Sequence, residues 1–155
     1  MREDCEDHIL LVRYLFPRET SGEFGEEKKN GGGSFLLCPG GGVDRKEGLK
    51  DAVVREVFEE TGLTVRAGKI LMVEDFLTPY HRMQKTWFLC KYISGELLQQ
   101  TVEAVEEGIL EVGWFTRQDL NTETVFPSII KTVCWQNFVS PGWETVYEGL
   151  RQISF

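Results

Sequence analysis

Residues 41–63 read GGVDRKEGLKDAVVREVFEETGL, and they predict a tight turn followed by an amphipathic helix. The turn is expected at the glycines that follow Pro39, because glycine lets the backbone approach a ligand closely. The helix is expected to end at Thr61-Gly62, since glycine is the usual residue in the left-handed helix stop. The residues between these two points carry most of the chemistry that the chain offers.

The acidic side chains of this helix fall on its apolar side. Residues three and four apart share one face of a helix with about 3.6 residues per turn, so Glu56, Glu59 and Glu60 project together. The apolar residues of the same face are Leu49, Ala52 and Val53. Close-packed carboxylates that are buried repel one another and lose hydration, so a positive group is expected among them. Magnesium or manganese, which prefer oxygen ligands, would meet this need.

A surface helix laced with ion pairs is the alternative interpretation. Asp51, Arg55 and Glu59 stand four residues apart, and Arg55 is expected to hold Glu59 while it neutralises part of the acidic cluster. The position of the acids on the apolar side favours the metal-binding interpretation. Val54 and Phe58 add apolar residues on the far side, which predicts a helix covered on both sides.

The pattern of these residues resembles the Nudix box. Gly41, Glu47 and the run from Arg55 to Leu63 (REVFEETGL) fill its defining positions. The resemblance implies a Nudix hydrolase with an α/β fold, an α/β/α sandwich around a mixed central sheet. It also implies cleavage of a nucleoside diphosphate linked to another group, with Mg²⁺ or Mn²⁺ as cofactor. Of two helix starts that the residues allow, at Asp44 or at Gly48, the family pattern favours the later one.

Matched residue by residue, the resemblance implies metal ligands at Glu56, Glu59 and Glu60. Arg55 would be the orienting partner of these acids, and a backbone carbonyl of the glycine turn, such as that of Gly41, would complete the metal shell. Catalysis would then depend on Glu59, Glu60 and Arg55. The resemblance also implies that Glu47 is an auxiliary acid; a helix projection places it nearly opposite Glu56, which argues against direct contact with the same metal.

The general base stays open between two positions. Glu60 of the box is one, and the other is the acidic segment 103–108, because in this family a glutamate outside the box often serves. Glu107 is the preferred member of that segment, by its position before Ile109. The alternative is that the segment is a solvated acidic loop.

Substrate identity also stays open. A proline at about the position of Pro79 resembles the ADP-ribose hydrolases, and a tyrosine at the position of Tyr80 resembles the dinucleoside-polyphosphate hydrolases, so the marker does not choose. Phe76 and Tyr80 are expected to stack on a base, unless they are core residues. Arg13 is expected to reach a phosphate or to pair with an acid. Competing functions are a nucleoside triphosphate pyrophosphohydrolase of the pool-cleansing type, a catalytically silent nucleotide-binding module and a partner-binding protein.

Composition limits the partners. A length of 155 residues fits a single domain over residues 1–155, and a net charge of −8 argues against a nucleic-acid polymer. A small nucleotide remains compatible, because a bound metal reverses the local sign of charge. No stretch approaches the roughly 20 apolar residues of a membrane span, and the acidic start does not resemble a signal peptide, so no membrane is expected and the location is expected to be cytoplasmic. The residues leave a homodimer open.

The remaining segments follow from apolar runs and turn signals. Residues 18–34 are expected to be a mobile loop insertion or a flap over the substrate. A helix is expected over 126–138, and a last strand or hook over 143–155. Strands are expected over 8–16, 35–38, 65–78, 84–93 and 109–116.

Overall fold

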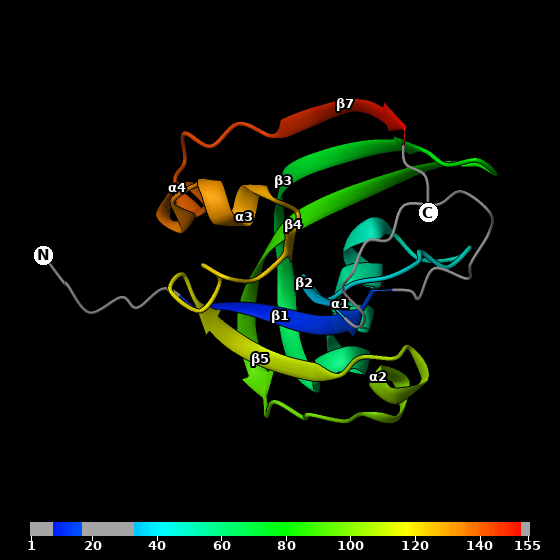
Figure 1. Cartoon of the computed structure of the whole chain (residues 1–155), viewed down its shortest axis with the longest axis vertical. Helices are drawn as coiled ribbons and strands as arrows, with labels where there is room; N and C mark the ends of the chain where they lie inside the picture. Colours follow the sequence, from blue (N-terminus) through cyan, green and yellow to red (C-terminus); the bar gives the residue numbers. More distant parts are fainter. Residues whose placement is uncertain (1–7, 17–32, 153–155) are drawn as a thin grey trace, which may run out of the picture. The chain divides into compact units, whose positions relative to one another are not determined.

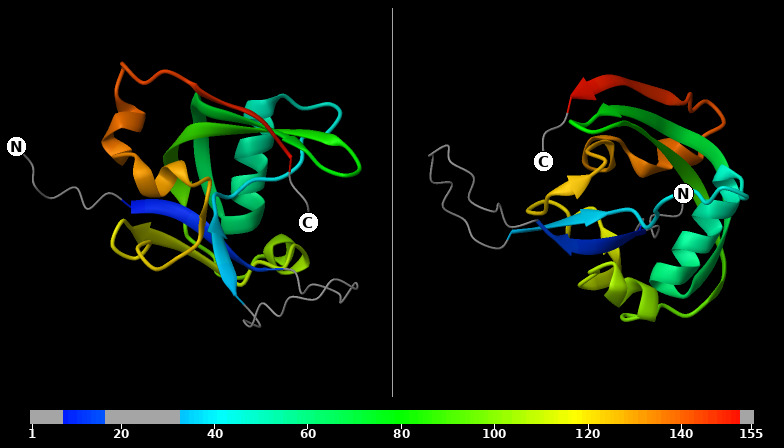
Figure 2. Two further views of the ribbon diagram at one scale, coloured as in Figure 1. Left: turned by 45° about the horizontal axis from the view of Figure 1, so that its top comes forward. Right: turned by 90° about the vertical axis from the view of Figure 1, so that its right-hand side faces the viewer.

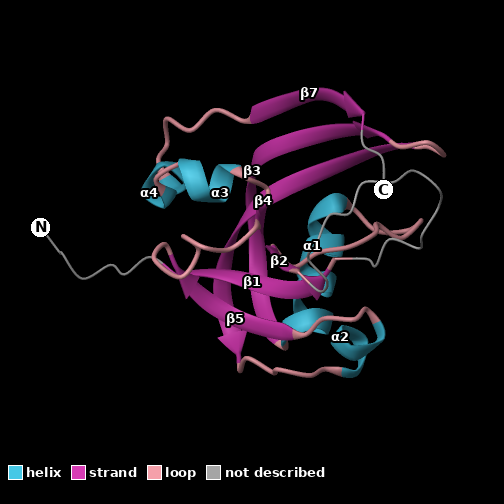
Figure 3. Cartoon of the chain, in the orientation of Figure 1, coloured by secondary structure: helices cyan, strands magenta, loops and turns pink. Residues whose placement is uncertain are grey.

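A computed structural model describes residues 8–16 and 33–152 (Figure 1). The chain divides into two compact units built from interleaved segments. The first unit comprises Met1–Pro39, Glu59–Gly62 and Leu97–Thr132, and the second comprises Gly40–Phe58, Leu63–Glu96 and Val133–Phe155. Helices and strands occur in both, and each unit has a mixed sheet (Figure 3), which confirms the predicted α/β class with mixed strand pairing. A single domain over residues 1–155 stays a prediction.

The sheet of the first unit has the strand order β5-β1-β2-β6. Its strands are β1 (His8–Leu15), β2 (Ser34–Leu37), β5 (Glu111–Thr116) and β6 (Val125–Phe126). β1 runs antiparallel to both β2 and β5, and β6 joins β2 in parallel; Figure 2 shows β1 beside β2 in both views. The predicted strands at 8–16, 35–38 and 109–116 are confirmed, with Ser34 added to β2.

Side chains alternate between the two faces of this sheet, as they do along any strand. Leu11 and Leu36 are fully buried on one face. Val12 lies on the other face and packs with Ala104, Ile109 and Val112 into one apolar cluster. Burial of both faces explains why β1 reads as a nearly continuous apolar run instead of a strict alternation.

The acidic segment 103–108, expected as a loop, contains a short helix instead. α2 spans Val102–Glu106, and Glu107 is its C-terminal cap residue. The helix begins at Thr101, whose side chain accepts a hydrogen bond from the Ala104 backbone N–H at 3.0 Å. Ala104 is fully buried, which anchors the helix through its one small apolar side chain in that turn.

The second unit contains the sheet β4-β3-β7, made of β3 (Leu63–Leu77), β4 (Arg82–Gly95) and β7 (Val146–Gln152). β3 and β4 form a long antiparallel pair, and β7 lies parallel to β3. The predicted strands at 65–78 and 84–93 and the last strand after residue 143 are confirmed. Figure 2 shows the ribbon of β7 following β3.

Two adjacent acids of β3 are buried and hydrogen-bonded. Asp75 accepts from Arg82 Nε at 2.9 Å and from the Tyr147 hydroxyl at 3.0 Å. Glu74 accepts from the Trp87 indole N–H at 2.7 Å and pairs with Arg151. Since Tyr147 and Arg151 belong to β7, these side chains attach the last strand to β3 in addition to its backbone pairing.

The predicted helix over 126–138 is wrong. Val125–Phe126 pair with β2 as strand β6, and two short helices follow, α3 (Ile129–Thr132) and α4 (Trp135–Val139). Cys134 between them is extended, with φ −64° and ψ 124°. The apolar residues that suggested one helix belong to two short ones, with Ile130 buried in α3 and Trp135 buried in α4.

Most of the expected loop 18–34 lies outside the described residues. In the part of the chain that the structure describes, no helix has both the length and the apolar character to cross a bilayer.

Candidate active site

α1 (Leu49–Thr61) carries the acids of the box. The Gly48 N–H donates to the Asp51 carboxylate at 3.3 Å, which stabilises the later of the two predicted starts. Gly62 has φ +76°, the left-handed conformation that ends a helix. Both predicted ends of the helix are therefore confirmed, apart from the residue or so by which helix boundaries vary.

Glu56 and Glu60 lie on the buried side of α1. Their exposed fractions are 5% and 0%, and Ala52 of the same face is also buried. The predicted projection of acids onto the apolar stripe is confirmed for these two residues. The prediction that the helix is covered on both sides is wrong, because Phe58 is exposed.

Glu60 meets a second carboxylate within the first unit. One of its oxygens lies within 4.8 Å of an oxygen of Glu107, the cap residue of α2. The Tyr14 hydroxyl of β1 donates to Glu60 Oε1 at 3.4 Å, a long hydrogen bond. Glu56 stands one turn before Glu60 on the same face of α1, with an oxygen within the same distance of Glu60.

Thr101 determines where Glu107 lies relative to Glu60. Its hydroxyl donates to the Glu59 backbone carbonyl at 2.5 Å and accepts from the Ala104 N–H at 3.0 Å. One side chain therefore begins α2 and ties that helix to the last turn of α1. The sequence analysis missed Thr101, although a threonine before an acidic turn is a recognised helix-start signal.

The glycine turn lies against Glu56 within the second unit. A Cβ atom built on Gly41 would come within 2.7 Å of the Glu56 carboxyl oxygens, so only glycine fits there without displacing them. Gly40 has φ +152°, which also favours glycine. The backbone of the turn is thus close to a carboxylate, as a shared ligand shell would require.

Arg55 connects the turn to the helix. Its guanidinium donates to Glu47 at 2.5 and 3.1 Å, to Glu56 Oε1 at 2.9 Å and to the Gly42 carbonyl at 2.9 Å. The hydrogen bonds from Arg55, and then the one from the Asp44 N–H, lower the pKa of Glu47. Arg55 therefore orients Glu56 and Glu47, and the role of Glu47 as an auxiliary acid stays a prediction.

The donor set fits a hard divalent cation. Glu60 and Glu107 of the first unit offer carboxylate oxygens, and Glu56 offers another one turn earlier on α1; such oxygens are the ligands that Mg²⁺ and Mn²⁺ prefer. Glu59, the residue directly before Glu60 on α1, is half-buried. Among the described residues it is not part of the group of close carboxylates. Its role as a metal ligand stays a prediction.

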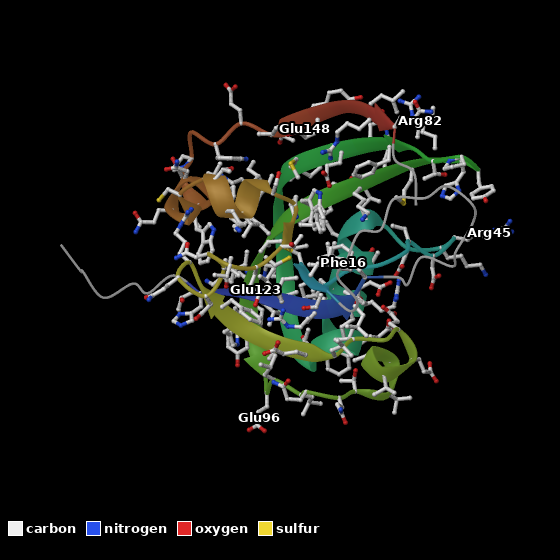
Figure 4. The ribbon with its side chains drawn as sticks, in the orientation of Figure 1. Phe16, Arg45, Arg82, Glu96, Glu123 and Glu148 are labelled. Carbon is white, nitrogen blue, oxygen red and sulfur yellow. The ribbon has the colours of Figure 1, made fainter. Side chains whose placement is uncertain are left out.

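Arg13, expected to reach a phosphate or to pair with an acid, binds acids of the first unit. Its guanidinium donates to Glu111 at 2.6 Å and to Glu123 at 2.9 and 3.1 Å, and also to Ser34 (Figure 4 labels Glu123). The hydrogen bonds to Glu123 raise the pKa of Arg13 above its usual value. A phosphate would have to compete with two carboxylates for this side chain, and its role in binding substrate stays a prediction.

The two aromatic residues expected to stack on a base lie in different surroundings. Phe76 is buried on β3, with the Arg151 guanidinium 5.0 Å from the ring centre and Lys85 Nζ at 5.8 Å. Tyr80 lies in the turn between β3 and β4 and is 92% exposed. Both assignments stay predictions.

Comparison with known proteins identifies the family. The NAD-capped RNA hydrolase NudC of Salmonella heidelberg (strain SL476) is 30% identical over 115 residues, which cover 74% of this chain and 37% of the relative. The NudC of Citrobacter koseri is 34% identical over 80 residues, 52% of this chain and 28% of the relative. The chain thus spans little more than a third of the first relative and less than a third of the second.

Solved structures agree with the fold. An ADP-ribose pyrophosphatase from Streptococcus suis 89-1591 is 26% identical with a TM-score of 0.61, over 92% of this chain and 91% of the other. A MutT protein from Bacillus halodurans has a TM-score of 0.59 at 20% identity, over 96% and 83% of the two chains, and shows likeness of fold alone. The NUDIX domain profile matches residues 2–136, and the chain therefore belongs to the Nudix hydrolase family.

Proposed function

We propose that this chain is a metal-dependent hydrolase that cleaves the diphosphate bond of a nucleoside diphosphate linked to another group, such as ADP-ribose or a dinucleoside polyphosphate. The observation that carries the proposal is the fully buried carboxylate of Glu60 with an oxygen of Glu107 within 4.8 Å. Two carboxylates this close repel one another when both are ionised, and a cation beside them relieves that repulsion. The similarity to the Streptococcus suis ADP-ribose pyrophosphatase supports ADP-ribose as the first substrate to test.

Glu56, Glu59 and Glu60 of α1 and the Gly41 carbonyl are the proposed ligands of Mg²⁺ or Mn²⁺. The bound metal would neutralise the diphosphate and lower the pKa of a water molecule. Glu107 is the proposed general base, because its exposed position at the end of α2 lets it accept a proton from water. Arg55 would hold Glu56 in position by its 2.9 Å hydrogen bond.

The test is a screen of nucleotide derivatives with Mg²⁺, with Mn²⁺ and with EDTA. ADP-ribose, diadenosine polyphosphates and nucleoside triphosphates should be separated from their products by ion-exchange chromatography. We expect AMP and ribose 5-phosphate from ADP-ribose, only when metal is present. A triphosphate as the preferred substrate would release pyrophosphate and would favour the pool-cleansing alternative. Hydrolysis that persists in EDTA would remove the metal from the proposal.

A matched pair of variants tests the site itself. Glu107→Gln should lower kcat by about two to four orders of magnitude, the usual contribution of a general base. Glu106→Gln changes the neighbouring exposed acid, which lies outside the close group of carboxylates among the described residues, and should keep kcat near the wild-type value. Equal effects of both substitutions would argue for a general loss of negative charge. Nucleotide binding without hydrolysis by the wild-type chain would favour the catalytically silent module.

A further inference from the structure

Aromatic rings form a row across neighbouring strands of the first unit's sheet. Tyr14 of β1 stacks on Phe35 of β2 with ring centres 5.7 Å apart and planes at 21°. Phe35 also contacts Phe16 at 4.8 Å and meets the edge of Phe126 at 5.7 Å. In the register of the sheet, Tyr14 lies opposite Phe35 and Leu37 lies opposite Phe126. The rings of Tyr14, Phe35 and Phe126 therefore lie on one face of the sheet.

The outer members of the row are open to solvent. Phe16, which follows β1 and is labelled in Figure 4, is 42% exposed, and Phe126 of β6 is 43% exposed. Both touch the half-buried Phe35, so the three rings make one continuous apolar surface, the phenylalanine platform. Single exposed apolar residues are ordinary, whereas adjoining exposed rings are typical of a ligand site.

The platform is connected to the acidic residues of the same unit by one side chain. The Tyr14 ring lies against Phe35, and its hydroxyl donates to Glu60 Oε1 at 3.4 Å. Two aromatic rings, those of Tyr14 and Phe35, therefore connect the buried carboxylate to the exposed Phe16 and Phe126. A ligand that fits both ends must combine a flat apolar group with an anionic group that a metal at Glu60 can hold.

We propose that the phenylalanine platform binds the nucleobase of the substrate. The proposal rests on the proposed function, which supplies a nucleotide with its diphosphate near Glu60. Stacking accepts the face of any base, and its strength grows with the area of the ring system, so purine nucleotides should bind more tightly than pyrimidine nucleotides. Phe35 supports the two outer rings, and Phe16 and Phe126 offer the surface that solvent now covers.

The test compares the wild-type chain with the Phe16→Leu/Phe126→Leu double variant. Leucine keeps both positions apolar and removes the rings. Isothermal titration with AMP and with ribose 5-phosphate, in the presence of Mg²⁺, separates contacts of the base from contacts of the phosphate. We expect the double variant to bind AMP about 10-fold more weakly, the loss that stacking of one base predicts, and to raise the KM for ADP-ribose similarly. Ribose 5-phosphate should bind both proteins equally.

Trp114→Leu is the control. Trp114 is also an exposed aromatic residue of this sheet, but it pairs with Leu10 at the other end of β1. It should leave AMP binding unchanged, and melting temperatures should show that all variants fold. An equal loss of AMP affinity in Trp114→Leu would overturn the proposal, since the effect would then not belong to the platform.

Other outcomes separate this proposal from the proposed function. The double variant could hydrolyse ADP-ribose with the AMP affinity and the KM of the wild-type chain. This result would overturn the proposed nucleobase site and would leave the proposed hydrolase function unaffected. AMP binding that the double variant weakens, without hydrolysis of any diphosphate, supports the base site and removes the function. No measurable AMP binding to the wild-type chain also overturns the proposal. A change in sedimentation coefficient with AMP affinity unchanged would show that the platform is a contact between copies of the chain.

Discussion

Thr101→Ala is the substitution that best tests how the first unit holds Glu107. The Thr101 hydroxyl accepts from the Ala104 N–H at 3.0 Å and donates to the Glu59 carbonyl at 2.5 Å. Alanine removes both hydrogen bonds and opens no large cavity. The substitution should therefore release the start of α2 from the end of α1, while the sheet of the unit stays intact.

The expected loss follows from the two bonds. Loss of a threonine cap costs about 1 kcal/mol, and loss of a further half-buried hydrogen bond costs about 1 kcal/mol. A loss of about 2 kcal/mol should lower the melting temperature of a domain of this size by roughly 4–8 °C. Because Glu107 follows α2 directly, the Mg²⁺ concentration for half-maximal activity should also rise.

Urea unfolding and a Mg²⁺ titration of ADP-ribose hydrolysis measure the two effects. Thr101→Ser keeps the hydroxyl, so its free energy of unfolding and its Mg²⁺ concentration for half-maximal activity should both be close to the wild-type values. Thr132→Ala is the matched control, since its hydroxyl makes one exposed bond to the Ile129 carbonyl at 3.3 Å. A free energy of unfolding for Thr101→Ala within about 0.5 kcal/mol of the wild-type value, or one equal to that of Thr132→Ala, would refute the reasoning.

Further substitutions test the acids and the glycine turn. Glu60→Gln should lower turnover by orders of magnitude with the fold intact by circular dichroism, and turnover near the wild-type value would remove Glu60 from the metal shell. Gly41→Ala should raise the Mg²⁺ requirement, because its Cβ would come within 2.7 Å of the Glu56 carboxylate, whereas Gly42→Ala meets nothing within 4 Å and should not. Asp75 has its pKa lowered from 3.8 to about 2, first by its hydrogen bond from Arg82. A depressed pKa in the folded state stabilises the protein above pH 3.8, and this stabilisation is lost as the pH falls toward 2. Between pH 3.8 and 2, the free energy of unfolding measured in urea should therefore fall less for Asp75→Asn than for the wild type. Equal losses would mean that other carboxylates account for the acid sensitivity.

Local patterns in the sequence were enough to predict the helix of the Nudix box and most of the strands. The limits of α1 follow from Gly48 and Gly62, and the burial of Glu56 and Glu60 follows from helical periodicity, because each depends on residues only a few positions apart. The strands at 8–16 and 109–116 follow in the same way from short apolar runs. These features need no knowledge of which segments meet.

Contacts between distant segments account for what the patterns missed. Phe126 was predicted to begin a helix, but Val125–Phe126 pair with β2, whose backbone donors and acceptors favour a strand there. The acidic segment at 103–108 read as loop; Thr101 starts a helix there through the Ala104 N–H, and its bond to the distant Glu59 carbonyl fixes that helix at the end of α1. Arg13 could have bound a phosphate or an acid, and the fold brings Glu111 and Glu123 to it.

The candidate site likewise has a part that local sequence patterns predict and a part that depends on contacts between distant segments. Periodicity placed two carboxylates on the buried side of one helix, since residues four apart share a face whatever surrounds them. The approach of Glu107 and Tyr14 to Glu60 required closing long loops of chain, and no local preference specifies which side chains meet when such loops close.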